Sequence, residues 1–340
     1  MAPLPRSRVT PFRAFGRTGI DSAGPFHVLA AKGRGVRTTK GYITIFVCLT
    51  TKALHLELVG DLSTVSFYAA LTRFSGRRGK PSELWSNNAT CFHRADTELR
   101  DALRLAEHRW DLVASCPSGS RYRVAFYSTR APHFGGLWEA VVKSIKGHLR
   151  RVMGSRHLTY EEFSTVLVGI KAVLNNRPLT PLSGNTDDLG VLTPSHFLIG
   201  APLNSIIEAA PPDQDLDHLA QWELVRGIRA QFWARWSREY LNTLQQRSKW
   251  ITPHRNLTLG DIVTVLDSSL LSTDGRWHLG RITGVHPGPD GLVSAVTVRT
   301  ATGEYTRPIT KVTLLPMITQ TASQPASPGG KTALDTVGGT

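Results

Sequence analysis

Residues 42–58 read YITIFVCLTTKALHLEL, and this stretch decides the fold class. Its first half, Tyr42–Leu49, is a continuous β-rich run of the kind that forms a buried strand. Over residues 54–58 three leucines alternate with His55 and Glu57, as a half-buried strand requires. We therefore expect two adjacent strands.

Strands and helices alternate on both sides of this pair. Further strands are predicted at Arg17–Pro25, which ends at Gly24-Pro25, Glu83–Ser86 and Tyr122–Tyr127. Helices are predicted behind the N-cap Ser63, over Asp96–Glu107, along the apolar stripe from Trp138 to Val152, and behind the capping-box pair Thr159 and Glu162, with a stop at Pro178. This order predicts a mixed α/β domain that closes near Gly200.

Beyond that domain, residues 218–249 form a long helical segment that carries Trp222, Trp233, Trp236 and Tyr240 among several arginines. We favour aromatic core packing here over a base-stacking surface. Short β runs at Asp261–Leu266, Trp277–Val285, Leu292–Arg299 and Tyr305–Leu315 then predict a small β-barrel.

The charge balance favours a nucleic-acid partner. The chain has 40 Lys and Arg against 26 Asp and Glu, a net charge of +14, which suits a phosphate-rich partner. No apolar run is long enough to span a bilayer, and the N-terminus lacks a signal-peptide pattern, so we expect no membrane partner. Three cysteines without paired spacing predict no zinc site, no disulfide framework and an intracellular location.

Three positions are candidates for chemistry: Asp21 in a strand, Asn87 at the end of a later strand, and Glu139 in the first turn of a basic helix. Each has an ordinary structural explanation when taken alone, such as a turn cap or a complement to the helix dipole. Glu139, Lys143, Lys146 and Arg150 share one helix face. Together with Arg151, the basic members of this face could neutralise phosphates.

Several motifs, in order along the chain, closely resemble the integrase of BEL/Pao-type LTR retrotransposons. They are GIDSAGP (19–25), FVCL (46–49), KALHLELV (52–59), APHFGGLWE (131–139), NNRPL (175–179) and LTPSHFLIG (192–200). The motifs FWARW (232–236) and PGPDG (287–291) resemble the module that follows the integrase core in those Pol polyproteins. The resemblance covers about residues 4–316.

This resemblance implies a ribonuclease H-like core in which two Asp and one Glu hold two Mg²⁺ (or Mn²⁺) ions, for 3′-end processing and DNA strand transfer. It also implies DNA as the partner, a homo-oligomer, no small-molecule substrate, and residence in the nucleus or in a cytoplasmic retroelement particle. Two such metal ions lie roughly 4 Å apart and act on the attacking and leaving oxygens.

Carried over by position, the first Asp matches Asp21 and the Glu matches Glu139, so these two are the expected metal ligands. The second Asp is replaced. Residues 86–92 read SNNATCF where the family has SDNGTNF, which puts Asn87 at the carboxylate position. The chain also departs from the family at Ala89 and Cys91, has Ser128-Thr129 where the family has Pro-Pro, and shows no His-His-Cys-Cys zinc element before the core. An amide adds no negative charge, so we expect weak or no catalytic activity.

The resulting domain prediction is a basic disordered N-terminus (1–14), a ribonuclease H-like integrase core with a mixed sheet and flanking helices (15–200), a helical linker (201–255), a small SH3-like β-barrel (256–316) and a disordered tail (317–340). Three functional hypotheses stay open. The chain is a catalytically impaired polynucleotidyl transferase, a non-catalytic nucleic-acid-binding or assembly protein derived from an integrase, or a degenerating genomic copy with no retained role.

Overall fold

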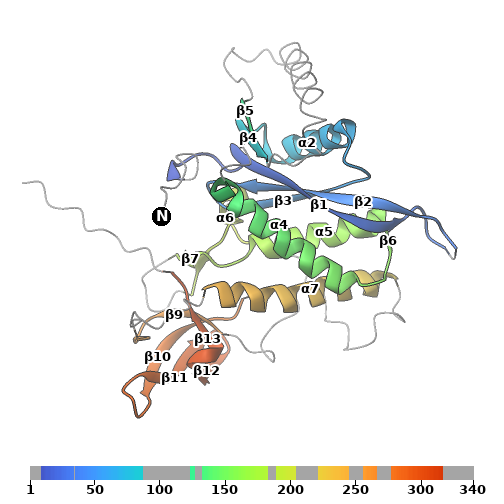
Figure 1. Ribbon diagram of the computed structural model, residues 1–340. Helices are drawn as coiled ribbons and strands as arrows, with labels where there is room; N and C mark the ends of the chain where they lie inside the picture. Colours follow the sequence, from blue (N-terminus) through green and yellow to red (C-terminus); the bar gives the residue numbers. More distant parts are fainter. Residues whose placement is uncertain are drawn as a thin grey trace, which may run out of the picture.

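The computed structural model describes residues 9–33, 35–86, 123–126, 132–182, 189–203, 221–244, 256–265 and 277–316. Its main sheet has the strand order β3-β2-β1-β4-β5 (Figure 1), and a short strand, β6, pairs with β1. The strands are β1 (Arg17–Leu29), β2 (Thr38–Cys48), β3 (Leu54–Val59), β4 (Glu83–Ser86), β5 (Arg123–Phe126) and β6 (Leu158–Thr159).

Strand directions give this sheet its fold class. β1 pairs antiparallel with β2, and β2 pairs antiparallel with β3, whereas β4 lies parallel to β1 and β5 parallel to β4. The core therefore has a ribonuclease H-like mixed sheet, which confirms the predicted α/β class. β1 is longer than expected. It continues past Gly24-Pro25 to Leu29, because a register shift between Ala23 and Phe26 lets its pairing with β2 resume.

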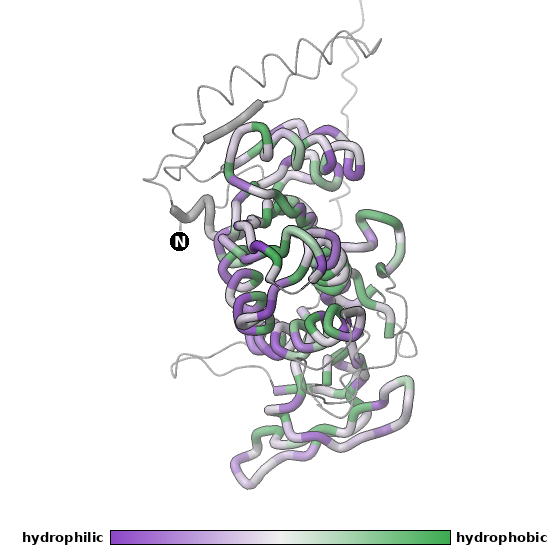
Figure 2. The backbone as a smooth tube through the Cα atoms, turned by 90° about the vertical axis from the view of Figure 1, so that its right-hand side faces the viewer, coloured by the Kyte–Doolittle hydropathy of each residue, from purple (hydrophilic) through white to green (hydrophobic). Residues whose placement is uncertain are grey.

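Helices cover both faces of the sheet. α2 (Thr64–Arg78) lies on one face, while α4 (Pro132–Met153) and α5 (Tyr160–Asn175) lie on the other (Figure 1). The caps are those predicted: Ser63 accepts the N–H of Ser66, and Thr159 and Glu162 form a capping box. In Figure 2 the helices carry both hydrophilic and hydrophobic residues.

β3 differs from the half-buried strand predicted. All six of its residues are buried, including His55 and Glu57. The three leucines of β3 join the core between the sheet and the helices α4 and α5, whereas His55 and Glu57 face α2 on the other side of the sheet. Arginines on α2 hydrogen bond to Glu57, which allows a carboxylate to be buried on an alternating strand.

α7 (Gln221–Leu244) packs against α4 and α5 and shares their core. Five of its apolar side chains are buried there: Val225, Ile228, Phe232, Trp233 and Trp236. The core interpretation of the aromatic residues is thus confirmed for Trp233 and Trp236, whereas Trp222 is 54% exposed. The segment that we expected to link two domains is helical, but its described part is a packed layer beneath α4 and α5 (Figure 1).

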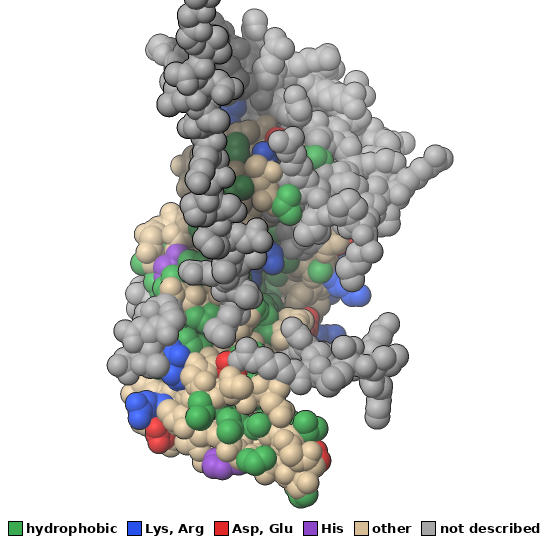
Figure 3. Space-filling model, turned by 90° about the vertical axis from the view of Figure 1, so that its left-hand side faces the viewer, with side chains coloured by type: hydrophobic (Ala, Val, Ile, Leu, Met, Phe, Trp, Pro, Cys, Tyr) green, Lys and Arg blue, Asp and Glu red, His purple; other side chains and the backbone are tan. Residues whose placement is uncertain are grey.

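A second sheet follows, with five antiparallel strands in the order β12-β11-β10-β9-β13. They are β9 (Ile262–Val265), β10 (Leu279–Pro287), β11 (Val293–Thr300), β12 (Gly303–Pro308) and β13 (Val312–Leu314). This arrangement fits the small β-barrel predicted. The expected single run Tyr305–Leu315 is instead two strands, because a 3₁₀ turn at Ile309–Lys311 follows Pro308. On the face shown in Figure 3, hydrophobic and polar side chains of the barrel are interspersed.

Smaller elements complete the description. β7 (Thr180–Pro181) and β8 (Val191–Leu192) form a two-stranded sheet, and α6 (His196–Ile199) follows. Of the N-terminal segment predicted to be disordered, Ala14 packs against the core and Phe12 lies under the guanidinium of Arg17, 4.6 Å from it. The predicted helix at Asp96–Glu107 and the predicted tail at 317–340 lie outside the described residues. None of the helices within the described ranges has the length and apolar character that a membrane crossing requires.

Candidate active site

Asp21 occupies the central strand of the main sheet. It pairs with Ile45 of β2 and is half-buried, and its Oδ1 accepts the N–H of Ser22 at 2.7 Å. A carboxylate at this position is held by its own backbone and has restricted contact with water. Burial of this kind disfavours the charged form of the carboxyl unless a positive charge lies nearby.

Glu139 and Lys146 of α4 lie close enough to Asp21 to change its ionisation. Burial raises the pKa of Asp21, the N–H of Ser22 lowers it, the charge of Glu139 raises it further, and the charge of Lys146 lowers it. Because like charges at one site disfavour ionisation, the Asp21–Glu139 pair forms a negative centre that a cation would stabilise. Two residues 118 positions apart in the sequence thus lie within electrostatic range of each other.

The third position of the predicted site, Asn87, lies outside the described residues, as do Ala89, Cys91 and Ser128. β4 ends at Ser86, whose Cα partner on β1 is Ile20, next to Asp21. Within the described ranges, no group of three His, Cys, Asp or Glu side chains could hold a metal ion. Asp21 and Glu139 do supply two anionic oxygen ligands of the hard type that Mg²⁺ prefers.

The basic residues predicted to bind nucleic acid continue along α4. Lys143, Arg150 and Arg151 are exposed, and Lys146 is half-buried near Asp21. Arg150 reaches back to β1, where its Nη2 donates to the carbonyl of Gly24 at 3.4 Å. Basic residues therefore follow Glu139 along the same helix, an arrangement that suits a phosphate-rich strand.

Gly19 and Trp138 pack together beside Asp21; the apolar stripe predicted Trp138 as a core residue, but nothing in the sequence indicated its contact with Gly19. Trp138 precedes Glu139 and is 1% exposed. A Cβ atom at Gly19 would lie 2.6 Å from Cε3 of Trp138, closer than real contacts allow. The indole thus lies directly against the β1 backbone two residues before Asp21. Only glycine permits this approach, and the approach brings the second turn of α4 against β1.

We expect Gly19→Ala to lower the free energy of unfolding by about 1–3 kcal/mol, the usual cost of overpacking a core. Urea denaturation would measure this change. As Trp138 and Glu139 move away, the pKa of Asp21 should also fall, which NMR titration would detect. Gly147→Ala on α4 is the matched control. Its Cβ would meet nothing within 4 Å, so the higher helix propensity of alanine should stabilise the protein. Equal stability of Gly19→Ala and wild type would contradict the packing contact.

The NNRPL motif joins the end of α5 to β3. Asn175 is fully buried; its Oδ1 accepts the N–H of Leu54 at 2.7 Å and its Nδ2 donates to the carbonyl of Leu54 at 2.8 Å. Arg177 donates to the carbonyls of Leu174 and Lys52, each at 2.6 Å. Polar residues at the end of an apolar helix were the available signal, but periodicity alone does not reveal their distant partners.

Comparisons with known proteins give remote likenesses. Residues 220–315 match the model of a "Family of unknown function (DUF5641)". A simian T-cell lymphotropic virus intasome structure, in complex with PP2A regulatory subunit B56 gamma, is 12% identical over 93% of this chain and 84% of that one, with a TM-score of 0.37. The HTLV-2 integrase catalytic core domain in complex with magnesium, in a trimeric form, is 14% identical over 56% of this chain and 99% of that one, with a TM-score of 0.34.

No curated protein matches the chain. The family match covers less than a third of the chain, and it spans α7 and the second sheet. Likenesses this remote bring no activity to this chain, and its own residues must support any function proposed for it.

Proposed function

We propose that this chain is an integrase-like protein of BEL/Pao retroelement origin, which binds DNA and descends from a polynucleotidyl transferase. The observation that carries the proposal is that Asp21 on the central strand and Glu139 on α4 lie within electrostatic range of each other. Glu139 is the eighth residue of α4, not in the first turn as expected, because the helix already begins at Pro132. The basic residues of α4 and the net charge of +14 support DNA as the partner.

The chain's own residues would divide the work as follows. Asp21 and Glu139 would hold Mg²⁺ or Mn²⁺, which when bound supplies Lewis-acid stabilisation of the transferring phosphate. Lys146, beside Asp21, would contact a phosphate oxygen, while Lys143, Arg150 and Arg151 would bind the strand that leads away. Such contacts with the backbone position DNA without reading its sequence, so binding should tolerate different sequences.

Asn87 stands where the related integrases have a carboxylate that catalysis requires. With asparagine at the third position, two divalent ions would share only two carboxylates, while the transition state adds negative charge that the ions must meet. We therefore propose that this copy is impaired in catalysis. It would work as a homo-oligomer in the nucleus or in a cytoplasmic retroelement particle.

The test is Mg²⁺- or Mn²⁺-dependent joining of a labelled DNA end to plasmid DNA. Wild type should stay near background, and Asn87→Asp should raise the rate at least tenfold, about 1.4 kcal/mol of barrier. Adding Asp21→Asn to the Asn87→Asp variant should return the rate to background. Robust wild-type activity that Asp21→Asn abolishes would show that Asn87 is tolerated, and the impaired reading would then be wrong.

The second candidate function is DNA binding or assembly without chemistry, favoured by the basic face of α4 and by Asn87. If Asn87→Asp restores nothing although the protein binds DNA, this candidate is supported. The departures at Ala89, Cys91 and Ser128 would then also have disabled catalysis.

A further inference from the structure

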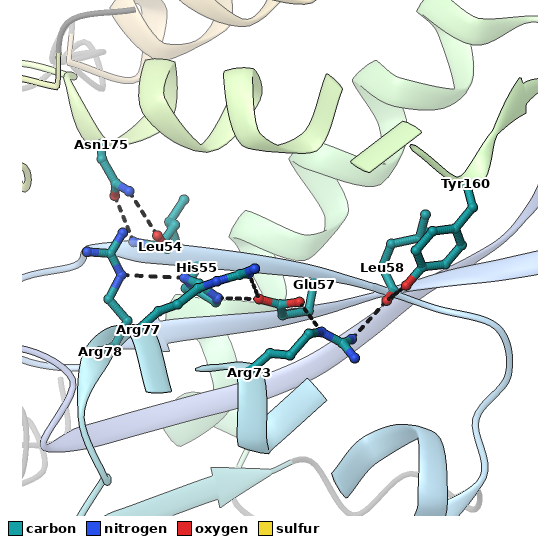
Figure 4. Close-up of polar contacts among 9 residues, drawn as sticks. All are labelled: Leu54, His55, Glu57, Leu58, Arg73, Arg77, Arg78, Tyr160 and Asn175. Carbon is teal, nitrogen blue, oxygen red and sulfur yellow. Dashed lines mark hydrogen bonds and ion pairs between the residues drawn. The ribbon is translucent and has the colours of Figure 1, made fainter. Parts of the chain in front are cut away.

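The buried carboxylate of Glu57 on β3 accepts hydrogen bonds from arginines of α2. Oε1 of Glu57 lies 2.7 Å from Nε2 of His55 and accepts from Arg77 at 2.6 Å, while Oε2 accepts from Arg73 at 2.7 Å (Figure 4). Arg73 also donates to the carbonyl of Leu58 at 3.1 Å. The side chain of Glu57 is only 5% exposed, so these hydrogen bonds replace its hydration.

His55 extends the cluster to a third arginine. Nε of Arg78 can only donate, so Nδ1 of His55, 3.5 Å away, is the acceptor. Nε2 of the ring then carries the proton that is donated to Glu57. Burial, the largest cause, lowers the pKa of His55 and agrees with this neutral tautomer. The imidazole thus connects Arg78 to the carboxylate without adding a charge of its own.

Positive charge exceeds negative charge in this cluster. Lys171 on α5 lies within electrostatic range of Glu57, Arg77 and Arg78; burial and the two arginines lower its pKa to about 8, against the opposing effect of Glu57. Two arginines thus bond to the one carboxylate, while Arg78 bonds to His55 and Lys171 lies within electrostatic range of Glu57. Across the described ranges, Glu57 is the only carboxylate that hydrogen bonds to Arg73, Arg77 or Arg78. A bound anion would relieve this imbalance.

The basic side chains are both held in place and accessible. The side chains of Arg73 and Arg77 are 36% and 56% exposed, and Glu57 fixes one edge of each guanidinium. Their remaining N–H groups can bind a ligand at a reduced entropic cost, because the side chains are already ordered. Arg73 and Arg77 are one helical turn apart on α2, and the half-buried Lys171, on α5 at the other face of the sheet, lies within electrostatic range of Arg77.

We propose that Arg73, Arg77 and Lys171 form a second phosphate-binding surface, at the β3 edge of the sheet, for the backbone of a nucleic-acid strand. β2 separates β3 from β1, the strand of Asp21, so this surface is distinct from the candidate active site. Guanidinium groups bind phosphate oxygens in a bidentate manner, and a row of basic groups suits a row of phosphates better than a single ion. The choice of a nucleic-acid strand rests on the proposed function.

The test measures DNA binding by full-length protein as a function of salt. The double variant Arg77→Gln/Lys171→Gln removes two charges but leaves Arg73 and Arg78 to stabilise Glu57 and His55. Binding of fluorescein-labelled double-stranded DNA of mixed sequence would be followed by anisotropy. Each lost phosphate contact reduces the slope of log K against log salt by about 0.9, so the slope should become shallower by about 2.

The control variant is Arg37→Gln/Lys40→Gln, which removes the same charge from exposed positions on and beside β2. Its slope should equal that of wild type. An unchanged slope in the Arg77/Lys171 variant would overturn this inference alone, whereas absence of DNA binding by wild type would also defeat the proposed function. The readout is independent of catalysis, so an inactive enzyme does not affect it.

Two further measurements separate other ligands. If tripolyphosphate stabilises wild type but not the double variant against thermal unfolding, and the DNA slope is unchanged, the ligand is a small polyphosphate and the strand proposal is wrong. If the double variant changes the oligomeric state in sedimentation at an unchanged DNA slope, the surface is a protein contact, and the proposal is again wrong.

Discussion

Glu57→Gln should lower the free energy of unfolding by about 3 kcal/mol, because it leaves the arginines of α2 without their buried counter-charge. In wild type, the carboxylate of Glu57 accepts hydrogen bonds from His55, Arg73 and Arg77. The substitution keeps the shape of the side chain but removes its charge, so lost packing contributes little. Urea denaturation followed by far-UV circular dichroism would measure the change.

The same residue should give the protein a distinct sensitivity to acid. Burial alone would raise the pKa of Glu57, but hydrogen bonds from His55 and Arg73 and the charge of Arg77 lower it from 4.5 to about 2. A carboxylate with a lowered pKa stabilises the folded state above its unfolded pKa. Wild type should therefore lose about 3 kcal/mol as the pH falls from about 4.5 to about 2. Glu57→Gln should lack this part of the loss.

Glu304→Gln is the matched control, since Glu304 pairs with Arg299 at 3.1 Å while both side chains are largely exposed. Exposed pairs contribute about 0–1 kcal/mol, so this variant should unfold almost as wild type does. Similar small losses in both variants would mean that water replaces Glu57 as the partner of the arginines. The cluster would then contribute little to holding α2 on β3.

Much of the fold could be predicted because it depends on local patterns. The β-rich run at Tyr42–Leu49 and the capping residues Ser63 and Thr159 each act over a few residues, and the structure has strands and helices where they indicate. The end of β1 and the break within Tyr305–Leu315 were missed. At the end of β1, pairing with β2 overrides the stop signal at Gly24-Pro25. Within Tyr305–Leu315, the strand that pairs with β11 ends at Pro308, and a 3₁₀ turn follows.

Burial of β3 could not be predicted from its alternation. Polar residues at every second position indicate an exposed face, but here three α2 arginines, 16 to 23 positions away, hydrogen bond to His55 and Glu57. The role of α7 was missed for a similar reason. Its aromatic residues indicated burial, but only the structure shows that α4 and α5 bury them. The Asp21–Glu139 pair came from the family resemblance, since no local period connects a strand residue with a helix so far along the chain.

The NNRPL motif leads to the last expected result: Arg177→Met should cost about 2–4 kcal/mol. Arg177 is 8% exposed, and its two hydrogen bonds of 2.6 Å satisfy the carbonyls of Leu174 and Lys52. Methionine fills a similar volume but cannot donate. The bond to Leu174 is buried and the bond to Lys52 is half-buried, and a buried carbonyl left without a partner costs about 1–3 kcal/mol. Urea denaturation would measure the loss.

The effect should concentrate in the turn between β2 and β3. Lys52 has a φ of 58°, a left-handed conformation that costs a non-glycine residue about 1–2 kcal/mol. The bond from Arg177 holds its carbonyl in that conformation, so in Arg177→Met amide exchange should quicken first at Lys52 and Leu54. Adding Lys52→Gly should restore about 1 kcal/mol by removing the strain. Arg150→Met, on an exposed side chain with one long hydrogen bond, should change stability by less than about 0.5 kcal/mol. If Arg177→Met costs no more than Arg150→Met, other groups satisfy the two carbonyls, and the turn depends on Asn175 alone for its attachment to α5.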